Sequence, residues 1–268
     1  MPIAWHHRVT GSSIMARWVP QLFKDNLDLD AVEGAMDPPY KLPNLLVEYV
    51  RQEPPGIVTG WWRGVGATHN IFMVETFIDE LAHKAGKDPL AYRLALLEHN
   101  PRAQAVLQLA ADKAGWGAPL PQGSGRGLSV QFAFGTYLAQ VAEVEVAEQE
   151  VRVKRVVCSL DCGMMVNPET IRAQMEGGIV FGISGALWGE ITTKGGRVQQ
   201  SNYDNYRVMR INEAPVIEVH LIESGEAPGG IGEPGTAGVA PALGNAVFAA
   251  SGKRIRQLPI ANAWRGTA

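Results

Sequence analysis

The sequence is poor in cysteine, with only Cys158 and Cys162 among its 268 residues. Two cysteines exclude a disulfide scaffold, a four-cysteine zinc site and a complete set of ligands for an iron–sulfur cluster. We interpret both as buried thiols. Uninterrupted apolar runs all fall short of the roughly 20 residues that cross a bilayer. The start, MPIAWHHRVTGSS, lacks the apolar core of a signal peptide.

An excess of positive charge is also missing. The 24 lysines and arginines and 27 acidic residues give a net charge of −3. No basic patch or tail stands out, so we expect no nucleic-acid partner. The six histidines are scattered apart from His6–His7, and the sequence contains no HExxH, paired-carboxylate or GxSxG motif. The sequence therefore predicts no metal site made of side chains.

Hydrophobic residues make up 46% of the chain, which is enough for the core of one large domain or two ordinary ones. The 30 glycines and 17 prolines together reach about 18% of the residues, above the usual value of roughly 12%. They gather in discrete motifs, so the composition predicts a turn-rich globular fold rather than a low-complexity chain.

The first half of the chain predicts an irregular segment followed by helices. Residues 1–60 contain one expected strand, 45–50, and a short helix within 15–23 that Pro20 limits. The first long helix has a cap at Thr68, an apolar face and a stop at Gly86; that face comprises Ile71, Val74, Phe77, Ile78, Leu81 and Ala85. Two more helices are expected after Asp88-Pro89 and Asn100-Pro101.

The second half predicts strands mixed with helices after a loop at 118–126. Alternating residues in 138–146 and 151–159 predict a β-hairpin around 147–150. A helix after Asn167-Pro168, a strand at 216–223, a glycine-rich loop at 227–238 and a helix at 241–251 follow. We therefore predict an α+β fold of short mixed sheets with packed helices, divided into segments 1–60, 61–120 and 121–268.

The loop GGIGEPGTAG carries one carboxylate, Glu233, between Gly232 and Pro234 and just before a helix. Glycines let a backbone approach a ligand closely, and a helix start stabilises an anionic carboxylate. Glu233 is therefore suited to act as a general base. The alternative is an ordinary surface turn with an incidental glutamate.

Two other segments are candidate binding elements. In WWRGVGATHN, Arg63 precedes a helix start, where an arginine fork suits an anionic or oxo group. The alternative is an Arg63 that pairs with a structural carboxylate, beside tryptophans in the core. In 159–187, Gln174 is followed by Gly177 and Gly178, which leave room for a flat ligand. The alternative there is a helix packed tightly on a sheet.

Three segments, in this order, resemble the molybdenum hydroxylases of the xanthine dehydrogenase/aldehyde oxidase family. They are RGVGATHNIFMVETFIDELAHKAGKDPLAYRLALL, DCGMMVNPETIRAQMEGGIVFGISGAL and GGIGEPGTAGVAPALGNAVFAASGKRIRQLPI. The resemblance is strongest to the large (beta) subunit of isoquinoline 1-oxidoreductase and related bacterial aldehyde dehydrogenases. It covers nearly the whole chain and implies the C-terminal part of a molybdopterin-binding domain.

The resemblance also implies a chemistry and a set of site residues. Molybdenum would be held by the dithiolene of a molybdopterin, in its cytosine dinucleotide form, and the enzyme would hydroxylate an aldehyde or an N-heterocycle with oxygen from water. Glu233 matches the family's general base, and Arg63 matches the arginine beside the metal; both are expected as catalytic residues. The residues expected to line the cofactor are Arg63, Gly64, Gly135, Thr136, Gln174 and Gly232.

Large subunits of this family are longer, and their N-terminal cofactor motifs are missing here. We therefore expect this chain to be a fragment or one product of a split gene. The expected partners are a chain with the missing N-terminal part, a small subunit with [2Fe–2S] clusters and, as a candidate electron acceptor, a cytochrome c. Through them we expect a periplasmic or membrane-associated location, with a cytoplasmic one left open. A non-catalytic structural subunit and a small-ligand-binding domain are the competing interpretations.

Overall fold

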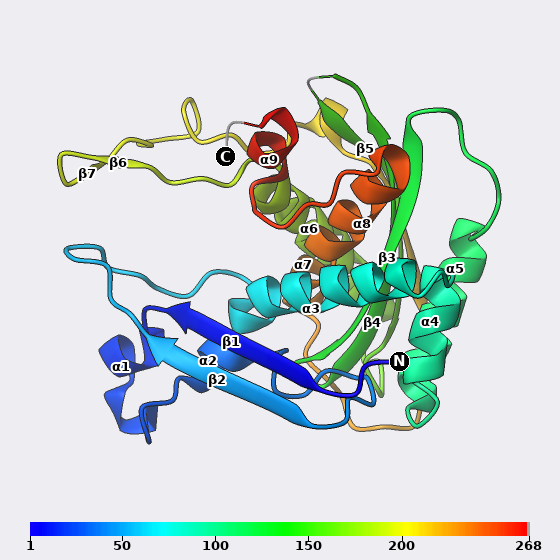
Figure 1. Ribbon diagram of the computed structural model, residues 1–268, viewed down its shortest axis with the longest axis horizontal. Helices are drawn as coiled ribbons and strands as arrows, with labels where there is room; N and C mark the ends of the chain where they lie inside the picture. Colours follow the sequence, from blue (N-terminus) through cyan, green and yellow to red (C-terminus); the bar gives the residue numbers. More distant parts are fainter. Residues whose placement is uncertain (149, 267–268) are drawn as a thin grey trace.

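A four-stranded sheet lies at the centre of the molecule (Figure 1), in a computed structural model that describes residues 1–148 and 150–266. The strands β3 (Ser124–Ala133), β4 (Thr136–Val146), β5 (Val151–Asp161) and β8 (Val216–Leu221) adjoin one another in that order. The first three are antiparallel, and β8 runs parallel to β5. The predicted hairpin is confirmed as β4 and β5, although Gln149 in its turn lies outside the described residues.

The loop predicted at 118–126 is too long, because β3 already begins at Ser124. This strand carries Gly125 and Gly127, which weaken the local strand signal. A Cβ on either residue would collide with the backbone of α8 (Val239–Ser251). The two glycines therefore serve close packing of a helix against the sheet, which no local pattern reveals.

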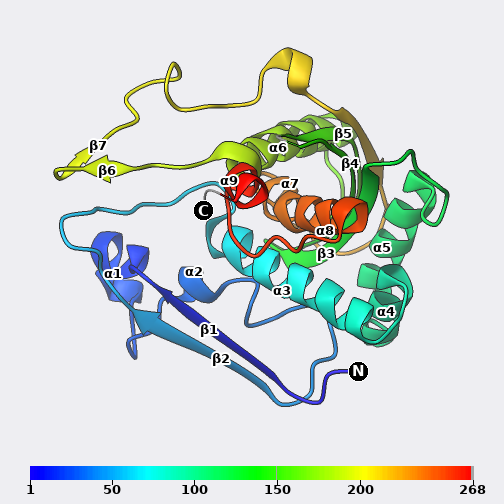
Figure 2. The same cartoon turned by 45° about the horizontal axis from the view of Figure 1, so that its top comes forward.

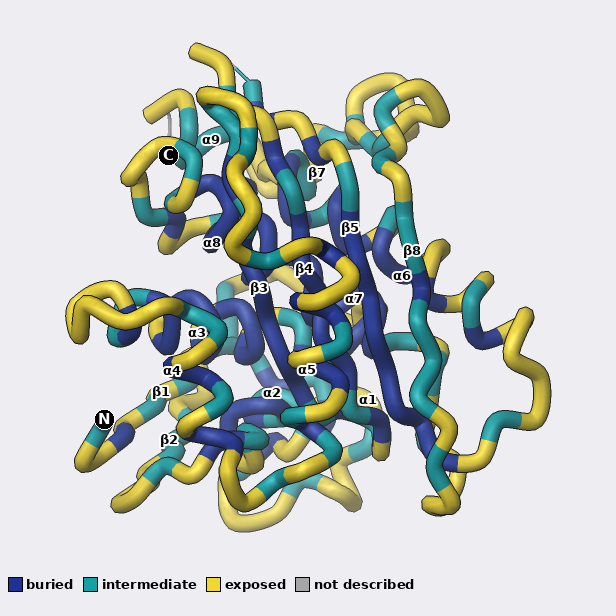
Figure 3. The backbone as a smooth tube through the Cα atoms, turned by 90° about the vertical axis from the view of Figure 1, so that its right-hand side faces the viewer, coloured by how far each residue is buried: buried dark blue, intermediate teal, exposed yellow. Residues whose placement is uncertain are grey.

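Helices cover both faces of the sheet, and Figure 2 shows α8 and α5 (Pro101–Ala114) on opposite sides of it. Along β4, Leu138 and Ala142 pack into a core with α8 and α6 (Pro168–Trp188), whereas Ala139 and Val141 pack with α5. This strict alternation follows from the period of two in a strand. The strands β3, β4 and β5 are consequently mostly buried, whereas the edge strand β8 is only partly buried (Figure 3).

Three helices begin where the sequence predicts. The side chains of Asp88, Asn100 and Asn167 accept hydrogen bonds from backbone N–H groups in the first turns of α4 (Pro89–Leu96), α5 and α6. A proline follows each cap, where its missing N–H costs no hydrogen bond. α5 ends at Gly115, whose φ is +64°. The structure confirms these helix boundaries. They could be predicted because each depends only on adjacent residues.

The cap predicted at Thr68 is wrong, because α3 (Val65–Lys84) begins three residues earlier, after Gly64. The Thr68 hydroxyl donates instead to the carbonyl of Arg63, at 3.2 Å. Ile71, Val74 and Ile78 are buried as predicted, and Leu81 is half-buried. Phe77 is 48% exposed, and Ala85 is exposed just past the last residue of the helix, so these two do not belong to the buried face. Phe77 lies about 100° around the helix from the buried face, and its ring touches Trp5 edge-on at 5.3 Å.

The first 60 residues are more regular than predicted. The strand expected at 45–50 is β2 (Leu45–Arg51), and it pairs in parallel with an unpredicted strand, β1 (Trp5–Gly11). Between them lie α1 (Ile14–Trp18), a 3₁₀ turn at Pro20–Leu22 and α2 (Leu29–Val32). The short helix limited by Pro20 is thus confirmed. β1 went unpredicted because WHHRVTG lacks an apolar run of its own.

The C-terminal part follows the prediction closely. The expected strand at 216–223 is β8, and the last predicted helix is α8, which begins two residues early and ends before Gly252 at φ +74°. The remaining elements were not predicted; they are β6 (Thr193–Lys194), β7 (Arg197–Val198), a 3₁₀ turn (Ile211–Glu213), α7 (Pro234–Ala237) and α9 (Ile260–Arg265). Within the described residues, no helix is both long and apolar enough to cross a membrane.

A buried ion-pair network joins α3 to α4. Arg93, which is fully buried, donates to Glu75 at 3.0 Å and lies 3.4 Å from Asp79. Arg254 reaches the second oxygen of Asp79 at 2.6 Å. The Glu75 carboxylate also accepts the backbone N–H of Val130 in β3 at 3.1 Å. The network therefore fixes α3 relative to the sheet.

Candidate active site

Arg63 meets the glycine-rich loop, although 169 positions separate it from Gly232. Its Nε atom donates to the Gly232 carbonyl at 2.7 Å, and its Nη2 atom donates to the same oxygen. Nη2 also donates to Oε1 of Gln174 on α6, at 3.2 Å. The arginine therefore joins three segments: the turn before α3, helix α6 and the loop before α7.

Glu233 reaches back in the opposite direction. Its Oε1 atom accepts the backbone N–H of Gly64, at 2.9 Å. Gly64 immediately precedes α3, where unpaired N–H groups and the helix dipole favour a negative charge. The carboxylate is partly buried, and the adjoining Gly232 is exposed. A carboxylate held in this way is oriented and accessible to a ligand.

The backbone at the start of α3 is unusual. Gly64 has φ +92°, and a Cβ there would collide with the Thr68 hydroxyl. The next residue, Val65, has φ +46°, a conformation that β-branched residues rarely adopt. Such strain persists only where surrounding contacts impose it, and it is common at functional sites. Arg63 and Glu233 both make their contacts beside this turn.

Helix α6 presents two kinds of surface. Met175 and Gly178 are buried, and the Thr236 hydroxyl of α7 donates to the Gly178 carbonyl at 3.0 Å. Gln174 and Gly177 are exposed, on the side where Arg63 lies. Tight packing therefore accounts for one face of α6. The other face is open, and Gln174 belongs to the group formed with Arg63.

Gly135 and Thr136 contact the same loop at its other end. The Thr136 hydroxyl donates to the Gly230 carbonyl at 2.7 Å, and the Gly230 N–H donates to the carbonyl of Phe134 at 2.6 Å. Thr136 is fully buried. The structure thus brings this pair to the loop without direct contact with Arg63 or Glu233. A role for the pair in lining a cofactor stays a prediction.

Two residues that support the loop were missed by the sequence reasoning. Gln131 and Gln140 are buried in β3 and β4, and their amides donate to the carbonyls of Pro234 at 2.6 Å and Gly235 at 3.0 Å. Among the described residues, neither Oε1 atom has a hydrogen-bond partner. The only signal in the sequence was a glutamine at an inward position of an otherwise apolar strand.

The surface beside Arg63 is aromatic and exposed. Trp61 and Trp62 are 49% and 41% exposed, so they are not core residues. The Trp62 ring packs against Phe181 of α6 at 4.8 Å, and the Arg63 guanidinium lies 5.9 Å from the Phe181 ring centre. The alternative of Arg63 paired with a structural carboxylate is wrong, because its hydrogen bonds go to a carbonyl and an amide.

Other chemistry-bearing groups lie elsewhere. Cys158 and Cys162 are buried free thiols, and burial raises the pKa of Cys158 to about 12. Burial alone would raise the pKa of Asp161, but hydrogen bonds from Arg102 and Ser224 lower it to about 2. No group of three histidine, cysteine or acidic residues could hold a metal within 1–148 and 150–266. These thiols and this carboxylate therefore have structural roles.

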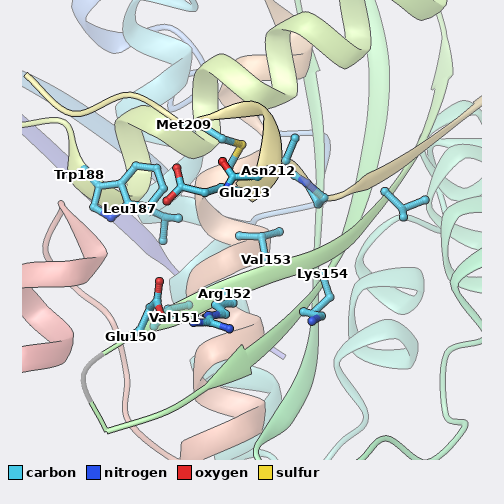
Figure 4. Close-up of a pocket in the computed structure, with 13 residues that line it drawn as sticks. Glu150, Val151, Arg152, Val153, Lys154, Leu187, Trp188, Met209, Asn212 and Glu213 are labelled. Carbon is cyan, nitrogen blue, oxygen red and sulfur yellow. Dashed lines mark hydrogen bonds and ion pairs between the residues drawn. The ribbon is translucent and has the colours of Figure 1, made fainter. Parts of the chain in front are cut away.

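One cavity lies apart from this group of residues, and a second one adjoins it. Figure 4 shows a pocket of about 440 Å³ between β5 and the end of α6, lined by Arg152, Lys154, Trp188 and Met209 among others, and none of the predicted site residues lines it. A smaller cavity of about 190 Å³ lies beside Val65 and Gly66 at the start of α3. The candidate site itself is an open face rather than a closed pocket.

Comparison with known proteins agrees with the motifs. The chain is 32% identical over 266 residues to the beta subunit of isoquinoline 1-oxidoreductase from Brevundimonas diminuta, covering 96% of this chain and 34% of that protein. It is 35% identical over 247 residues to a nicotinate dehydrogenase subunit from Pseudomonas putida, covering 83% and 20%. The chain thus spans about a third or less of the length of these relatives.

Solved structures share the fold at low identity. Quinoline 2-oxidoreductase from Pseudomonas putida 86 superposes with a TM-score of 0.79 at 14% identity, over 96% of this chain and 59% of that one. Aldehyde oxidoreductase from Desulfovibrio gigas superposes with a TM-score of 0.70 at 14% identity, over 98% and 46%. Residues 27–96 and 63–215 each match a molybdopterin cofactor-binding domain, and the second match alone spans more than half of the chain. The chain therefore belongs to the molybdopterin cofactor-binding domain family, as its motifs predict.

Proposed function

We propose that this chain supplies the general base and part of the molybdopterin site of a molybdenum-dependent oxidoreductase. That enzyme hydroxylates an aldehyde or an N-heterocycle with oxygen derived from water. The observation that carries the proposal is the Glu233 carboxylate, held by the Gly64 N–H beside Arg63. The names of the relatives, which refer to isoquinoline, nicotinate, quinoline and aldehydes, support these substrate classes.

The residues of the open face fit a molybdopterin. Arg63 and Gln174 offer a guanidinium and an amide to a polar ring and its phosphate, and both lie beside exposed backbone. Gly177 and Gly232 have open space where a Cβ would stand, so a large flat group can approach their backbone. Gly64, Gly135 and Thr136 complete the proposed set of cofactor-binding residues. The cytosine dinucleotide form is part of the same proposal.

The bound cofactor supplies the oxidation–reduction chemistry, and the chain supplies the acid–base chemistry. Glu233 accepts the proton of the oxygen nucleophile while the Gly64 N–H holds the carboxylate in place. Arg63 keeps the loop in position through the Gly232 carbonyl, so the base stays oriented. The rings of Trp62 and Phe181, which pack together beside Arg63, offer an aromatic surface to the bound group.

Partner chains complete the proposed enzyme. Because the chain spans 34% of the isoquinoline 1-oxidoreductase subunit, we propose a partner that carries the N-terminal part of the large subunit. A small subunit with [2Fe–2S] clusters would accept the electrons and pass them on, with a cytochrome c as a candidate acceptor. A periplasmic or membrane-associated location would follow from these partners, and a cytoplasmic one stays open.

The test is co-expression with the neighbouring reading frames, followed by assays of molybdenum, pterin nucleotide and turnover. The proposal expects a complex that contains molybdenum and oxidises an aldehyde or N-heterocycle, and that loses turnover in Glu233→Gln. A non-catalytic structural or ligand-binding subunit would leave turnover unchanged in Glu233→Gln. The contact between Glu233 and Gly64 favours the catalytic interpretation, since a structural subunit does not need an oriented, accessible carboxylate.

A further inference from the structure

Glu233 lies between two backbone carbonyls that side chains hold in place. On one side, Arg63 donates to the carbonyl of Gly232. On the other side, Nε2 of Gln131 in β3 donates to the carbonyl of Pro234 at 2.6 Å. The proline ring fixes φ of Pro234, and the peptide bond that joins it to Glu233 is planar. A single free backbone rotation therefore separates the anchored Pro234 carbonyl from the peptide plane that carries Glu233.

Two further donors hold the carbonyls that follow. Nε2 of Gln140 in β4 donates to the carbonyl of Gly235 at 3.0 Å. The hydroxyl of Ser129 in β3 donates to the carbonyl of Gly238, directly after α7, at 2.7 Å. Helix α7 has only four residues, which is too short for its own hydrogen bonds to fix it. The sheet therefore determines where α7 lies, and with it the preceding Glu233.

The two glutamines are retained at a cost to stability. Gln131 is 1% exposed and Gln140 is fully buried. Because a carbonyl only accepts hydrogen bonds, each amide must turn its Nε2 towards α7. Within residues 1–148 and 150–266, the Oε1 atom of each glutamine is left without a hydrogen-bond partner. A buried unpaired acceptor is unfavourable, and such a cost is more typical of functional sites than of packing.

The neighbouring backbone leaves room for both amides. A Cβ on Gly238 would stand 3.3 Å from Nε2 of Gln131 and 3.4 Å from Oε1 of Gln140. A side chain there would press on the two amides that hold α7. The glycine therefore serves the same arrangement as the two glutamines.

We propose that Gln131, supported by Gln140, is a positioning residue that aims the Glu233 carboxylate from the buried side of the loop. Arg63 holds the loop at the open face, where a bound group can take up its guanidinium. The glutamines are buried, so they keep their contacts when Arg63 turns to a ligand. This inference rests on the proposed function, because Gln131 affects turnover only through Glu233.

The assembled, molybdenum-loaded complex is the test system. Gln131→Met keeps the length of the side chain and removes the donor. Because the base is then misaligned, kcat should fall about 10- to 100-fold, with KM and molybdenum content unchanged. Ser159→Ala is the matched control and should leave kcat unchanged. Ser159 is also buried and donates to a backbone carbonyl, that of Val106 in α5 on the opposite face of the sheet.

A double-substitution cycle separates positioning from a general weakening of the fold. In a Glu233→Gln background, Gln131→Met should cost no further turnover, because both changes act on the same base. An equal loss in both backgrounds would overturn the proposal. Gln140→Met removes the donor one carbonyl further from Glu233, so it should show the same non-additivity with a smaller loss. This second variant decides the question if Gln131→Met does not assemble.

Hydrogen–deuterium exchange of the complex, followed by mass spectrometry, gives a readout without turnover. Gln131→Met should speed up exchange in residues 227–238, whereas Ser159→Ala should not. Unchanged exchange of this segment in Gln131→Met would also contradict the proposal. If exchange responds but Glu233→Gln keeps full turnover, the base assignment of the proposed function fails, while the anchoring of the loop by the glutamines stands.

Discussion

Arg63 and Glu233 are linked crosswise through each other's neighbours. The Arg63 guanidinium binds the carbonyl of Gly232, and the Glu233 carboxylate binds the N–H of Gly64. Each side chain therefore holds the backbone next to the other, so neither can move alone. The sequence predicts that the two residues meet despite their separation, and these contacts bring them together. Their chemical roles stay predictions, and the following variants test them.

Glu233→Gln tests the base. Glutamine keeps the length of the side chain and can still accept the Gly64 N–H, but it cannot take up a proton at working pH. The assembled complex should keep its molybdenum and lose about 100- to 10,000-fold in turnover, which corresponds to about 3–5 kcal/mol of activation free energy. Metal analysis and steady-state kinetics measure both quantities. Near-native turnover with full metal loading would remove the assignment.

Arg63→Ala tests the link between the segments. Without the guanidinium, the Gly232 carbonyl loses its donor and the loop that carries Glu233 gains freedom. Turnover should therefore fall much more than the melting temperature, which circular dichroism records. Arg152→Ala is the matched control, because the Arg152 side chain is 66% exposed and lies outside the site. Equal effects of the two substitutions on turnover would count against a role for Arg63.

Arg93→Met tests the buried network. Removal of Arg93 leaves the carboxylates of Glu75 and Asp79 buried with one cation fewer. Loss of one partner of a buried ion pair costs about 3–5 kcal/mol in the free energy of unfolding, which urea denaturation measures. Arg256→Met is the control, because the Arg256 side chain is 68% exposed in its pair with Glu80. It should cost less than about 1 kcal/mol.

The lowered pKa of Asp161 predicts that the stability of the fold depends on pH in the acidic range. Its pKa in the folded chain is lowered to about 2 from 3.8, so the ionised carboxylate stabilises the fold. That contribution is complete above pH 3.8 and is lost as the pH falls towards 2. The melting temperature of Asp161→Asn should accordingly be lower near neutral pH, with the difference shrinking as the pH drops through this window. A difference that is constant with pH would show that packing, rather than charge, is responsible.

The chain without partners should be metal-free and either insoluble or oligomeric. Its open face exposes Trp61, Trp62 and Phe181 next to the residues proposed to hold the cofactor. A contiguous aromatic surface of this kind favours association. Light scattering and metal analysis of the isolated chain test this expectation. A stable monomer would favour the interpretation of an independent ligand-binding domain.

The local parts of the fold were readable from the amino-acid sequence. The caps at Asp88, Asn100 and Asn167 depend on a side chain and the N–H groups two or three residues after it. The β4–β5 hairpin depends on alternation along adjacent segments. Arg63, Gln174 and Glu233 could be selected because their motifs resemble a known family. Each of these predictions needs only short-range information or a matched pattern.

The other features of the fold and of the site depend on contacts between distant segments, so only the tertiary structure decides them. β1 exists because β2, some 40 residues later, supplies its hydrogen-bond partners, and α3 begins at Val65 because distant contacts hold a strained turn. Gln131 and Gln140 carry no motif; they support the loop before α7 because their strands pack against it. Parallel strand pairing, backbone strain and contacts between a buried side chain and a distant loop are long-range properties. They depend on which segments meet in space, and that information does not reside in any single stretch of sequence.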